Sequence, residues 1–246
     1  RLFRRQRQMC IRDRIINAAK MSGAQAIHPG YGFLSENASF ARKVKKEKLI
    51  WVGPSPNVIS VMGDKLKAKE LAIKADVPTL PMTSKPNEAK KIGYPLLIKA
   101  AAGGGGKGMR IVNKEKDLKE SIVSAQREAK SGFNDERIFI ERYVEKSRHI
   151  EIQILGDSKG NVVHLGEREC SIQRRHQKII EESPSPRISD DVRNKMGEAA
   201  VKLAKQIKYE SAGTVEFLFD DKTEEFWFLE VNTCLLYTSD AADETT

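Results

Sequence analysis

Hydrophobic and polar positions follow two periods in the first third of this chain. Apolar residues at helical spacing predict helices over residues 15–22, 40–48 and 55–74. Short apolar runs between them predict strands over residues 24–27 and 50–52. Helices alternating with strands in this order indicate an α/β unit.

A different order begins near residue 77, where Pro78, Pro81 and Pro86 mark a linker. A small lid is predicted over residues 80–142, with strands at 96–99, 109–112 and 138–141 and a helix near 116–130. Further strands are predicted at 149–155, 162–167, 177–180, 215–219 and 226–232, with a helix near 190–207. The whole chain is therefore expected to be α/β, with an α+β arrangement in its second part.

The last two strands carry polar groups at matching positions. Side chains alternate along a strand, so Glu230 and Asn232 point the same way, and the turn at 220–224 can bring Glu216 opposite them. Carboxylate and amide oxygens suit Mg²⁺, which joins a few protein oxygens to the phosphates of a nucleotide. The alternative is a solvated strand edge.

A glycine-rich loop follows the strand that ends at Lys99. Glycine lets backbone N–H groups come close to an anion and adopt positive φ. The loop spells GxGxxG from Gly103 to Gly108, but a strand follows where a dinucleotide fingerprint needs a helix. A Walker A loop also fails, because Ala101 replaces its first glycine and Gly108 its Ser or Thr. The remaining pattern is a strand, a loop that covers phosphates, and another strand.

Composition excludes several classes of function. The 246 residues carry a net charge of +9, but lysines spread along 43–48 and 65–74 are typical of solvated helix faces, and a nucleic-acid groove would need interleaved aromatic residues. Three cysteines, Cys10, Cys170 and Cys234, form no disulfide framework or zinc pair, and Cys170 is interpreted as structural. Without a long apolar run or a signal peptide, we expect no membrane or nucleic-acid partner, and a cytoplasmic location, or the mitochondrial matrix in a eukaryote.

A series of longer motifs resembles one family. They are AIHPGYGFLSEN (26–37), MGDK (62–65), IKAAAGGGGKGM (98–109), RHIEIQ (148–153), ERECSIQRRHQKIIEESPSP (167–186), GTVEFLF (213–219) and LEVNT (229–233). The chain resembles the biotin carboxylases, ATP-grasp enzymes that act as subunits or domains of acetyl-, propionyl- and methylcrotonoyl-CoA carboxylases and of pyruvate carboxylase. This resemblance implies an ATP-grasp fold, with a partial N-terminal α/β domain over 15–77 and a truncated ATP-grasp domain over 78–233.

The two ends depart from the family. Residues 1–14 and 234–246 are similar to translated sequencing-adaptor DNA, so we expect adaptor read-through there. The family also has an arginine where Cys234 stands, followed by a glutamate thought to act as the base. We therefore expect the 246-residue chain by itself not to carboxylate biotin.

The resemblance implies roles for individual residues. Nucleotide binding falls to Lys65, Lys99, Gly105, Gly106, Glu141, Arg142, Val144, His149, His176, Glu216 and Glu230. Magnesium or manganese would be held by Glu216, Glu230 and Asn232. The catalytic group would be Lys178, Glu230 and His176, with Lys178 on bicarbonate, unless Lys178 merely pairs with Glu181 or Glu182. Glu151 and Gln173 would lie in the wall of the site or directly behind the residues that line it.

The implied reaction is the MgATP-dependent carboxylation of biotin by bicarbonate through carboxyphosphate. The implied partners are a biotin carboxyl carrier protein or domain, a carboxyltransferase and a second copy of the intact protein. One alternative is another ATP-grasp ligase of the carbamoyl-phosphate type, and another is a non-catalytic nucleotide-binding or basic interaction module.

Overall fold

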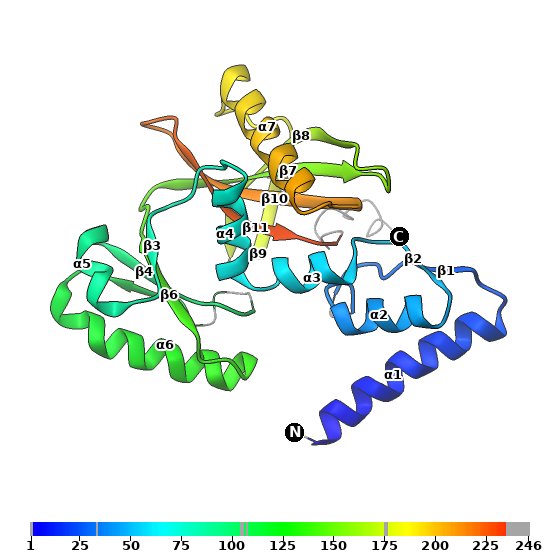
Figure 1. Ribbon diagram of the computed structural model, residues 1–246. Helices are drawn as coiled ribbons and strands as arrows, with labels where there is room; N and C mark the ends of the chain where they lie inside the picture. The colour runs from blue at the N-terminus through cyan, green and yellow to red at the C-terminus, as the bar shows by residue number, and fades with distance from the viewer. Residues whose placement is uncertain (1, 33, 104–105, 107, 175–176, 235–246) are drawn as a thin grey trace.

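The computed structural model describes residues 2–32, 34–103, 106, 108–174 and 177–234, with side chains from residue 11 onward (Figure 1). The described residues form sheets of two, four and five strands together with helices. This mixture confirms the predicted fold class. None of the described helices is long and apolar enough to cross a bilayer.

The N-terminal part is a small α/β unit. Its elements are α1 (Leu2–Met21), β1 (Ala26–Ile27), α2 (Ala38–Lys46) and β2 (Ile50–Trp51), and β1 pairs with β2 in parallel. Asn37 caps α2 by accepting a hydrogen bond from the Phe40 backbone N–H at 2.9 Å. Phe40 then packs edge-on against Trp51, with ring centroids 5.7 Å apart. Helix α1 begins at Leu2, so it is longer than the helix predicted for residues 15–22.

Two helices connect this unit to the rest of the molecule. They are α3 (Pro56–Met62) and α4 (Lys65–Lys74), and Ser55 and Asp64 cap their N-termini. Apolar residues of both helices share a core with the five-stranded sheet. Both helices therefore pack against the sheet. The division of the chain at residue 77 stays a prediction.

The four-stranded sheet lies within the segment predicted as a lid, with strand order β3-β6-β4-β5 and all neighbours antiparallel. Its role as a lid stays a prediction. Ala125 and Ala129, one turn apart on α6, let this helix approach the apolar face that includes Leu96 and Ile140. The short elements in the proline-rich linker were not predicted. The lid elements are β3 (Met82–Thr83), the 3₁₀ turn Pro86–Glu88, α5 (Ala89–Ile92), β4 (Leu96–Ala100), β5 (Arg110–Val112), the 3₁₀ turn Glu115–Asp117, α6 (Leu118–Phe133) and β6 (Ile138–Arg142).

The five-stranded sheet is antiparallel, with strand order β11-β10-β7-β8-β9. Along β7, Ile150, Ile152 and Ile154 face the core shared with α7, whereas His149 and Glu151 face the other side. That alternation separates the core from the polar groups described below. The elements are β7 (Ser147–Gly156), β8 (Val162–Arg174), β9 (Gln177–Glu182), α7 (Asp190–Gln206), β10 (Ser211–Asp220) and β11 (Phe226–Asn232).

Candidate active site

A cavity of about 710 Å³ lies between the four-stranded and five-stranded sheets. Most of the residues predicted for a nucleotide site line this one space, although they come from segments far apart in the chain. They are Lys65, Lys99, Gly106, Glu141, Arg142, Val144, His149, Lys178, Glu216, Glu230 and Asn232, with Gln173 beside them. The predicted Gly105 and His176 lie outside the described residues.

The acidic hairpin forms as its sequence pattern predicted. Glu216 on β10 is the register partner of Glu230 on β11, and Thr214 is the partner of Asn232. A β-bulge follows Glu216. Bulges re-aim side chains and are frequent next to active sites. The hairpin thus delivers two carboxylates and one amide to a single cavity.

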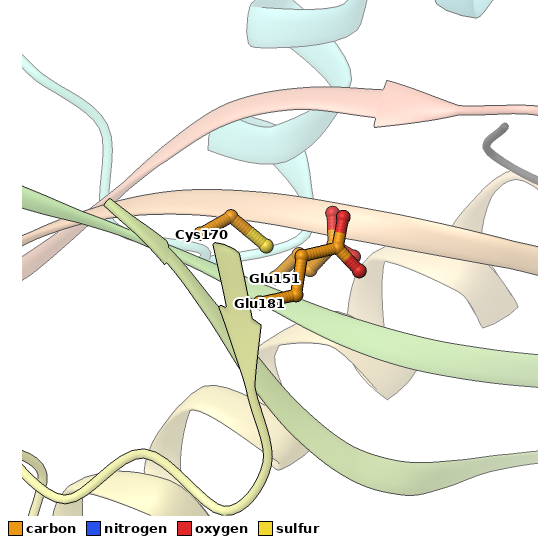
Figure 2. Close-up of side chains that lie close together, drawn as sticks. All are labelled: Glu151, Cys170 and Glu181. Atoms are coloured by element: carbon orange, nitrogen blue, oxygen red, sulfur yellow. The ribbon is translucent and has the colours of Figure 1, made fainter. Parts of the chain in front are cut away.

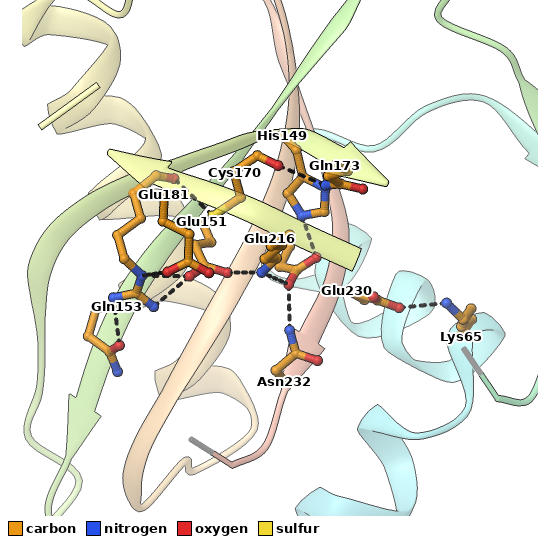
Figure 3. Close-up of polar contacts among 12 residues, drawn as sticks. Lys65, His149, Glu151, Gln153, Cys170, Gln173, Glu181, Glu216, Glu230 and Asn232 are labelled. Carbon is orange, nitrogen blue, oxygen red and sulfur yellow. Dashed lines mark hydrogen bonds and ion pairs between the residues drawn. The ribbon is translucent and has the colours of Figure 1, made fainter. Parts of the chain in front are cut away.

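Glu216 is the most heavily engaged of these groups. It is 2% exposed, and its carboxylate contacts His149 Nε2 at 2.5 Å, Lys178 Nζ at 2.8 Å and Asn232 Nδ2 at 2.5 Å (Figure 3). Burial raises the pKa of this carboxyl, but His149 and Lys178 outweigh burial and lower the pKa to about 2. Glu216 therefore remains an anion at neutral pH.

Lys178 on β9 joins two buried carboxylates. Its Nζ pairs with Glu151 and, at 2.8 Å, with Glu216. Lys178 therefore links β9, the edge strand that pairs with β8, to carboxylates on β7 and β10. Although burial lowers the pKa of Lys178, Glu216 and Glu151 together raise it above its ordinary value. The alternative pairing with Glu181 or Glu182 is therefore wrong for the described contacts.

Glu151, Cys170 and Glu181 place their ligand atoms within 4.8 Å of one another (Figure 2). Basic side chains already pair with the carboxylates of this cluster. Arg168 contacts Glu151 at 2.6 Å and Glu181 at 3.9 Å, and Lys178 contacts Glu151. Burial raises the pKa of the Cys170 thiol, so the thiol stays protonated at neutral pH. The cluster is part of an ion-pair network, and Cys170 is buried as a structural cysteine should be.

Lys65 links the start of α4 to the hairpin. Its Nζ lies 2.5 Å from Glu230 Oε2, and its backbone N–H donates to Ala101 O at 2.9 Å. Burial lowers the pKa of Lys65, but the charge and hydrogen bond of Glu230, together with the charges of Glu216 and Glu141, raise it by more. Lys65 is therefore a cation held between the lid and the second acidic strand.

A buried cluster of three charges lies at the opposite wall, which Lys99 and Glu141 line. Lys99 Nζ lies 2.6 Å from Glu141 Oε1, and Lys69 Nζ lies 2.8 Å from Glu141 Oε2. The expectation that lysines of 65–74 form a solvated face is wrong for Lys69, which is 1% exposed. Residues four apart share a helix face, so the position of Lys69 one helical turn after Lys65 could have indicated that it lies near the site.

The hairpin offers a donor set that fits a hard cation. Glu216 and Glu230 supply carboxylate oxygens, and Asn232 can supply its amide oxygen because its nitrogen faces Glu216. Oxygen ligands of this kind suit Mg²⁺ or Mn²⁺. Lys65 and Lys178 balance the carboxylate charge in this structure, and His149 contacts Glu216.

Comparisons with known proteins agree with this geometry. Residues 4–59 match the family model for the biotin carboxylase N-terminal domain, and residues 64–246 match that for the ATP-binding domain of the carbamoyl-phosphate synthase L chain. The mitochondrial methylcrotonoyl-CoA carboxylase subunit alpha of Dictyostelium discoideum is 53% identical over 91% of this chain. This chain belongs to the biotin carboxylase family.

Two solved biotin carboxylase structures share the fold. The biotin carboxylase of Campylobacter jejuni, described as a βγ-ATP complex, superposes with a TM-score of 0.90 at 47% identity, covering 94% of this chain and 54% of its own. The biotin carboxylase domain of Hydrogenobacter thermophilus 2-oxoglutarate carboxylase, a dimer with MgADP, ADP and bicarbonate, gives 0.88 at 45% identity, covering 93% and 52%. The chain spans 33% of the Dictyostelium relative.

The sequence patterns did not predict two residues of this biotin carboxylase family member that contact the carboxylates of the site without lining the cavity. Lys69 was assigned to a solvated helix face, and Arg168 was given no role. Arg168 pairs with Glu151, whose carboxylate also binds Lys178. Alternation along β8 is a signal that could have placed Arg168, since it is the register partner of Glu151.

Proposed function

We propose that the intact protein is an ATP-dependent ligase that carboxylates biotin with bicarbonate, the first half-reaction of a biotin-dependent carboxylase. One observation carries this proposal: a single cavity is lined by Lys65 and Lys99, by Gly106 of the glycine loop, and by the oxygen donors of the acidic hairpin. The names of the C. jejuni and H. thermophilus structures support ATP, magnesium and bicarbonate as ligands here.

The lid side of the cavity is suited to the nucleotide. We assign adenine to the backbone and side chains of Glu141 to Val144, and the ribose to the region of His149. Lys65 and Lys99 are compact cations that suit phosphate oxygens. Gly106 has φ +73°, a conformation that glycine adopts without strain, so the loop backbone can close over the phosphates.

The hairpin side is suited to the metal and to bicarbonate. Glu216, Glu230 and Asn232 would hold Mg²⁺ or Mn²⁺, which disperses negative charge on the transferred phosphoryl group when bound. Lys178 faces the cavity from β9 and would bind bicarbonate. His176, which lies outside the described residues, would act near the phosphates, as in the resemblance.

The reaction divides into balanced steps. A bicarbonate oxygen attacks the γ-phosphorus, and the bond from that phosphorus to ADP breaks, which leaves carboxyphosphate. The bond between carbon and the bridging oxygen then breaks to give CO₂ and phosphate. The ureido N–H of biotin loses its proton to a base, and the nitrogen forms a bond to the carbon of CO₂. The chain contributes by fixing bicarbonate and the γ-phosphate in line.

The proposal extends to partners and location. A biotin carboxyl carrier protein or domain would present the substrate, a carboxyltransferase would use the product, and the intact protein would form a homodimer. The subunit names of the relatives and the dimer named for H. thermophilus support these assignments. We place the protein in the cytoplasm, or in the mitochondrial matrix of a eukaryote.

Residue 234 limits what the 246-residue chain can do. Cys234 stands where the family resemblance expects an arginine that orients bicarbonate and stabilises the biotin enolate. A protonated thiol cannot replace that charge, and burial raises the pKa of Cys234 to about 11. We therefore propose that this chain binds MgATP but does not carboxylate biotin, whereas the intact protein with the arginine does both.

A second candidate is a ligase of the carbamoyl-phosphate type. The family model matched over residues 64–246 carries that description, so the ATP-binding part alone is compatible with it. Both candidates activate bicarbonate with ATP. They differ in the nitrogen that accepts the carboxyl group. It is a ureido nitrogen of biotin in one case and the nitrogen of ammonia in the other.

Steady-state ATP hydrolysis by the intact protein tests the proposal. We expect hydrolysis that requires bicarbonate and rises on addition of free biotin, with no increase on addition of ammonium. Stimulation by ammonium but not by biotin would support the second candidate. A rate of ATP hydrolysis that does not depend on bicarbonate would contradict both candidates.

A further inference from the structure

Helix α4 sends two lysines, one turn apart, to two different sheets. Lys65 reaches Glu230 on β11 of the five-stranded sheet, and Lys69 reaches Glu141 on β6 of the lid. Residues four apart lie on one face of a helix, so this face supplies positive charge to both walls of the cavity. The reaction proposed above gives Lys65 a role and leaves Lys69 without one.

Lys69 belongs to a buried cluster that holds one more cation than anion. Lys69, Glu141 and Lys99 are 1%, 0% and 6% exposed, and each lysine contacts a different oxygen of the carboxylate. The pKa of Glu141 is lowered to about 2, because the two lysines outweigh its burial. Burial lowers the pKa of Lys69, and the charge of Glu141 opposes that shift. When all three groups are ionised, the cluster carries a net charge of +1.

Only part of this cluster can touch a ligand directly. Lys99 and Glu141 belong to the described residues that line the cavity, and Lys69 does not. We propose that Lys69 is a positioning residue, which binds one oxygen of Glu141 so that Lys99 keeps its positive charge available to the nucleotide phosphates. This inference rests on the proposed nucleotide site and adds the residue that sets its charge.

Electrostatics in a buried site make the third charge decisive. Glu141 and Lys99 alone would form a neutral pair, and a lysine neutralised by a buried carboxylate attracts phosphate weakly. A second lysine on the same carboxylate takes up its remaining oxygen, so an incoming phosphate meets a cationic cluster. Replacing Lys69 with a neutral side chain would leave the neutral pair.

Neighbouring contacts hold Lys69 in place. Asp64, which caps α4, pairs with Arg137 of the lid at 3.0 Å, and the Lys65 backbone N–H donates to Ala101 O at 2.9 Å. The Phe139 ring centroid lies 6.0 Å from Lys69 Nζ, at the limit of a cation–π contact. The start of α4 is thereby tied to the lid next to the charge cluster.

Binding measurements on the intact protein test this inference with ATP and adenosine as probes. Adenosine lacks phosphates. The dissociation constant of adenosine divided by that of ATP, called the ratio below, therefore reports phosphate binding separately from folding and adenine binding. We expect Lys69→Met to weaken ATP binding at least tenfold and adenosine binding by less than twofold. Lys69→Arg should keep the wild-type ratio, as should Lys67→Met, a control on an exposed lysine of the same helix.

A double variant tests charge balance directly. Lys69→Met with Glu141→Gln again leaves a net charge of +1 on Lys99. Any loss of adenine contact at Glu141 weakens ATP and adenosine binding alike, so the ratio should return to within threefold of wild type. An unchanged ratio in Lys69→Met would overturn the inference. If that variant does not fold, a double variant with a low ratio would overturn it equally. Failure of the wild-type protein to bind ATP would instead count against the proposed function.

Discussion

Glu216 and Glu230 face each other as register partners on β10 and β11, but different basic side chains contact them. Lys178 and His149 contact Glu216, whereas Lys65 contacts Glu230 at 2.5 Å. Glu216 is 2% exposed, and the side chain of Glu230 is 32% exposed. Glu230 is therefore the more accessible carboxylate for an incoming metal–nucleotide complex.

Replacing Glu230 with glutamine in the intact protein should lower ATP turnover about 100-fold or more. A neutral amide cannot balance the metal charge as negative charge shifts on the phosphates. Turnover should be measured across Mg²⁺ concentrations, with Glu225→Gln as a control on an exposed glutamate of the same hairpin. Unchanged turnover at saturating Mg²⁺ would reject Glu230 as a ligand.

Removing the charge of Lys178 should destabilise the fold as well as the site. Lys178→Met would leave Glu151 and Glu216 buried with less compensation, and losing one partner of a buried pair costs about 3–5 kcal/mol. Lys195→Met removes an exposed pair with Asp191, which solvent screens, so it should change the unfolding free energy little. Urea unfolding measures both, and equal losses would show that the Lys178 network contributes little.

Glu141 should give stability a specific dependence on pH. Its pKa in the folded protein is about 2, below the ordinary 4.5, so its contribution is fully present above that ordinary value and is lost as pH falls toward 2. The unfolding free energy of wild type should therefore fall more steeply below about pH 5 than that of Glu141→Gln. Glu120→Gln, on an exposed face of α6, should match the wild-type slope. Parallel curves for wild type and Glu141→Gln would contradict the assigned ionisation.

The glycine at the start of the phosphate loop should not tolerate a side chain. Gly103 has φ +81°, and an added Cβ would lie 2.0 Å from the Phe133 ring. Gly160 has φ +86° with open space around it, so Gly160→Ala should show the backbone strain alone, about 1–2 kcal/mol. Gly103→Ala should lower the melting temperature further and weaken ATP binding. Equal melting temperatures for the two variants would show that the loop adjusts freely.

Much of the fold follows from local sequence patterns. Strand β11 matches its predicted range of 226–232, because apolar alternation begins directly after a polar turn. Strand β8 continues to Arg174, beyond the predicted end at residue 167, because pairing with β9 extends it. Short elements such as α5 and β3 depend on packing within the lid. The prolines around them indicated a linker, so these elements were not predicted.

The candidate site was predictable where one element supplies several groups. Alternation and one turn sufficed for Glu216 opposite Glu230. The burial of Lys69 depends on Glu141, which is distant in the sequence and belongs to another sheet, so the helix pattern alone could not distinguish it from exposed neighbours. The partners of Lys178 likewise lie on β7 and β10, beyond any local pairing.

Transfer of isotope from bicarbonate to phosphate tests the proposed chemistry most directly. The intact protein would be supplied with ¹⁸O-labelled bicarbonate, MgATP and biotin, and the released phosphate analysed by mass spectrometry. Attack of a bicarbonate oxygen on the γ-phosphorus predicts one labelled oxygen in each phosphate, formed together with carboxybiotin. Unlabelled phosphate would show that water attacks ATP instead, and would contradict carboxylation through carboxyphosphate at this site.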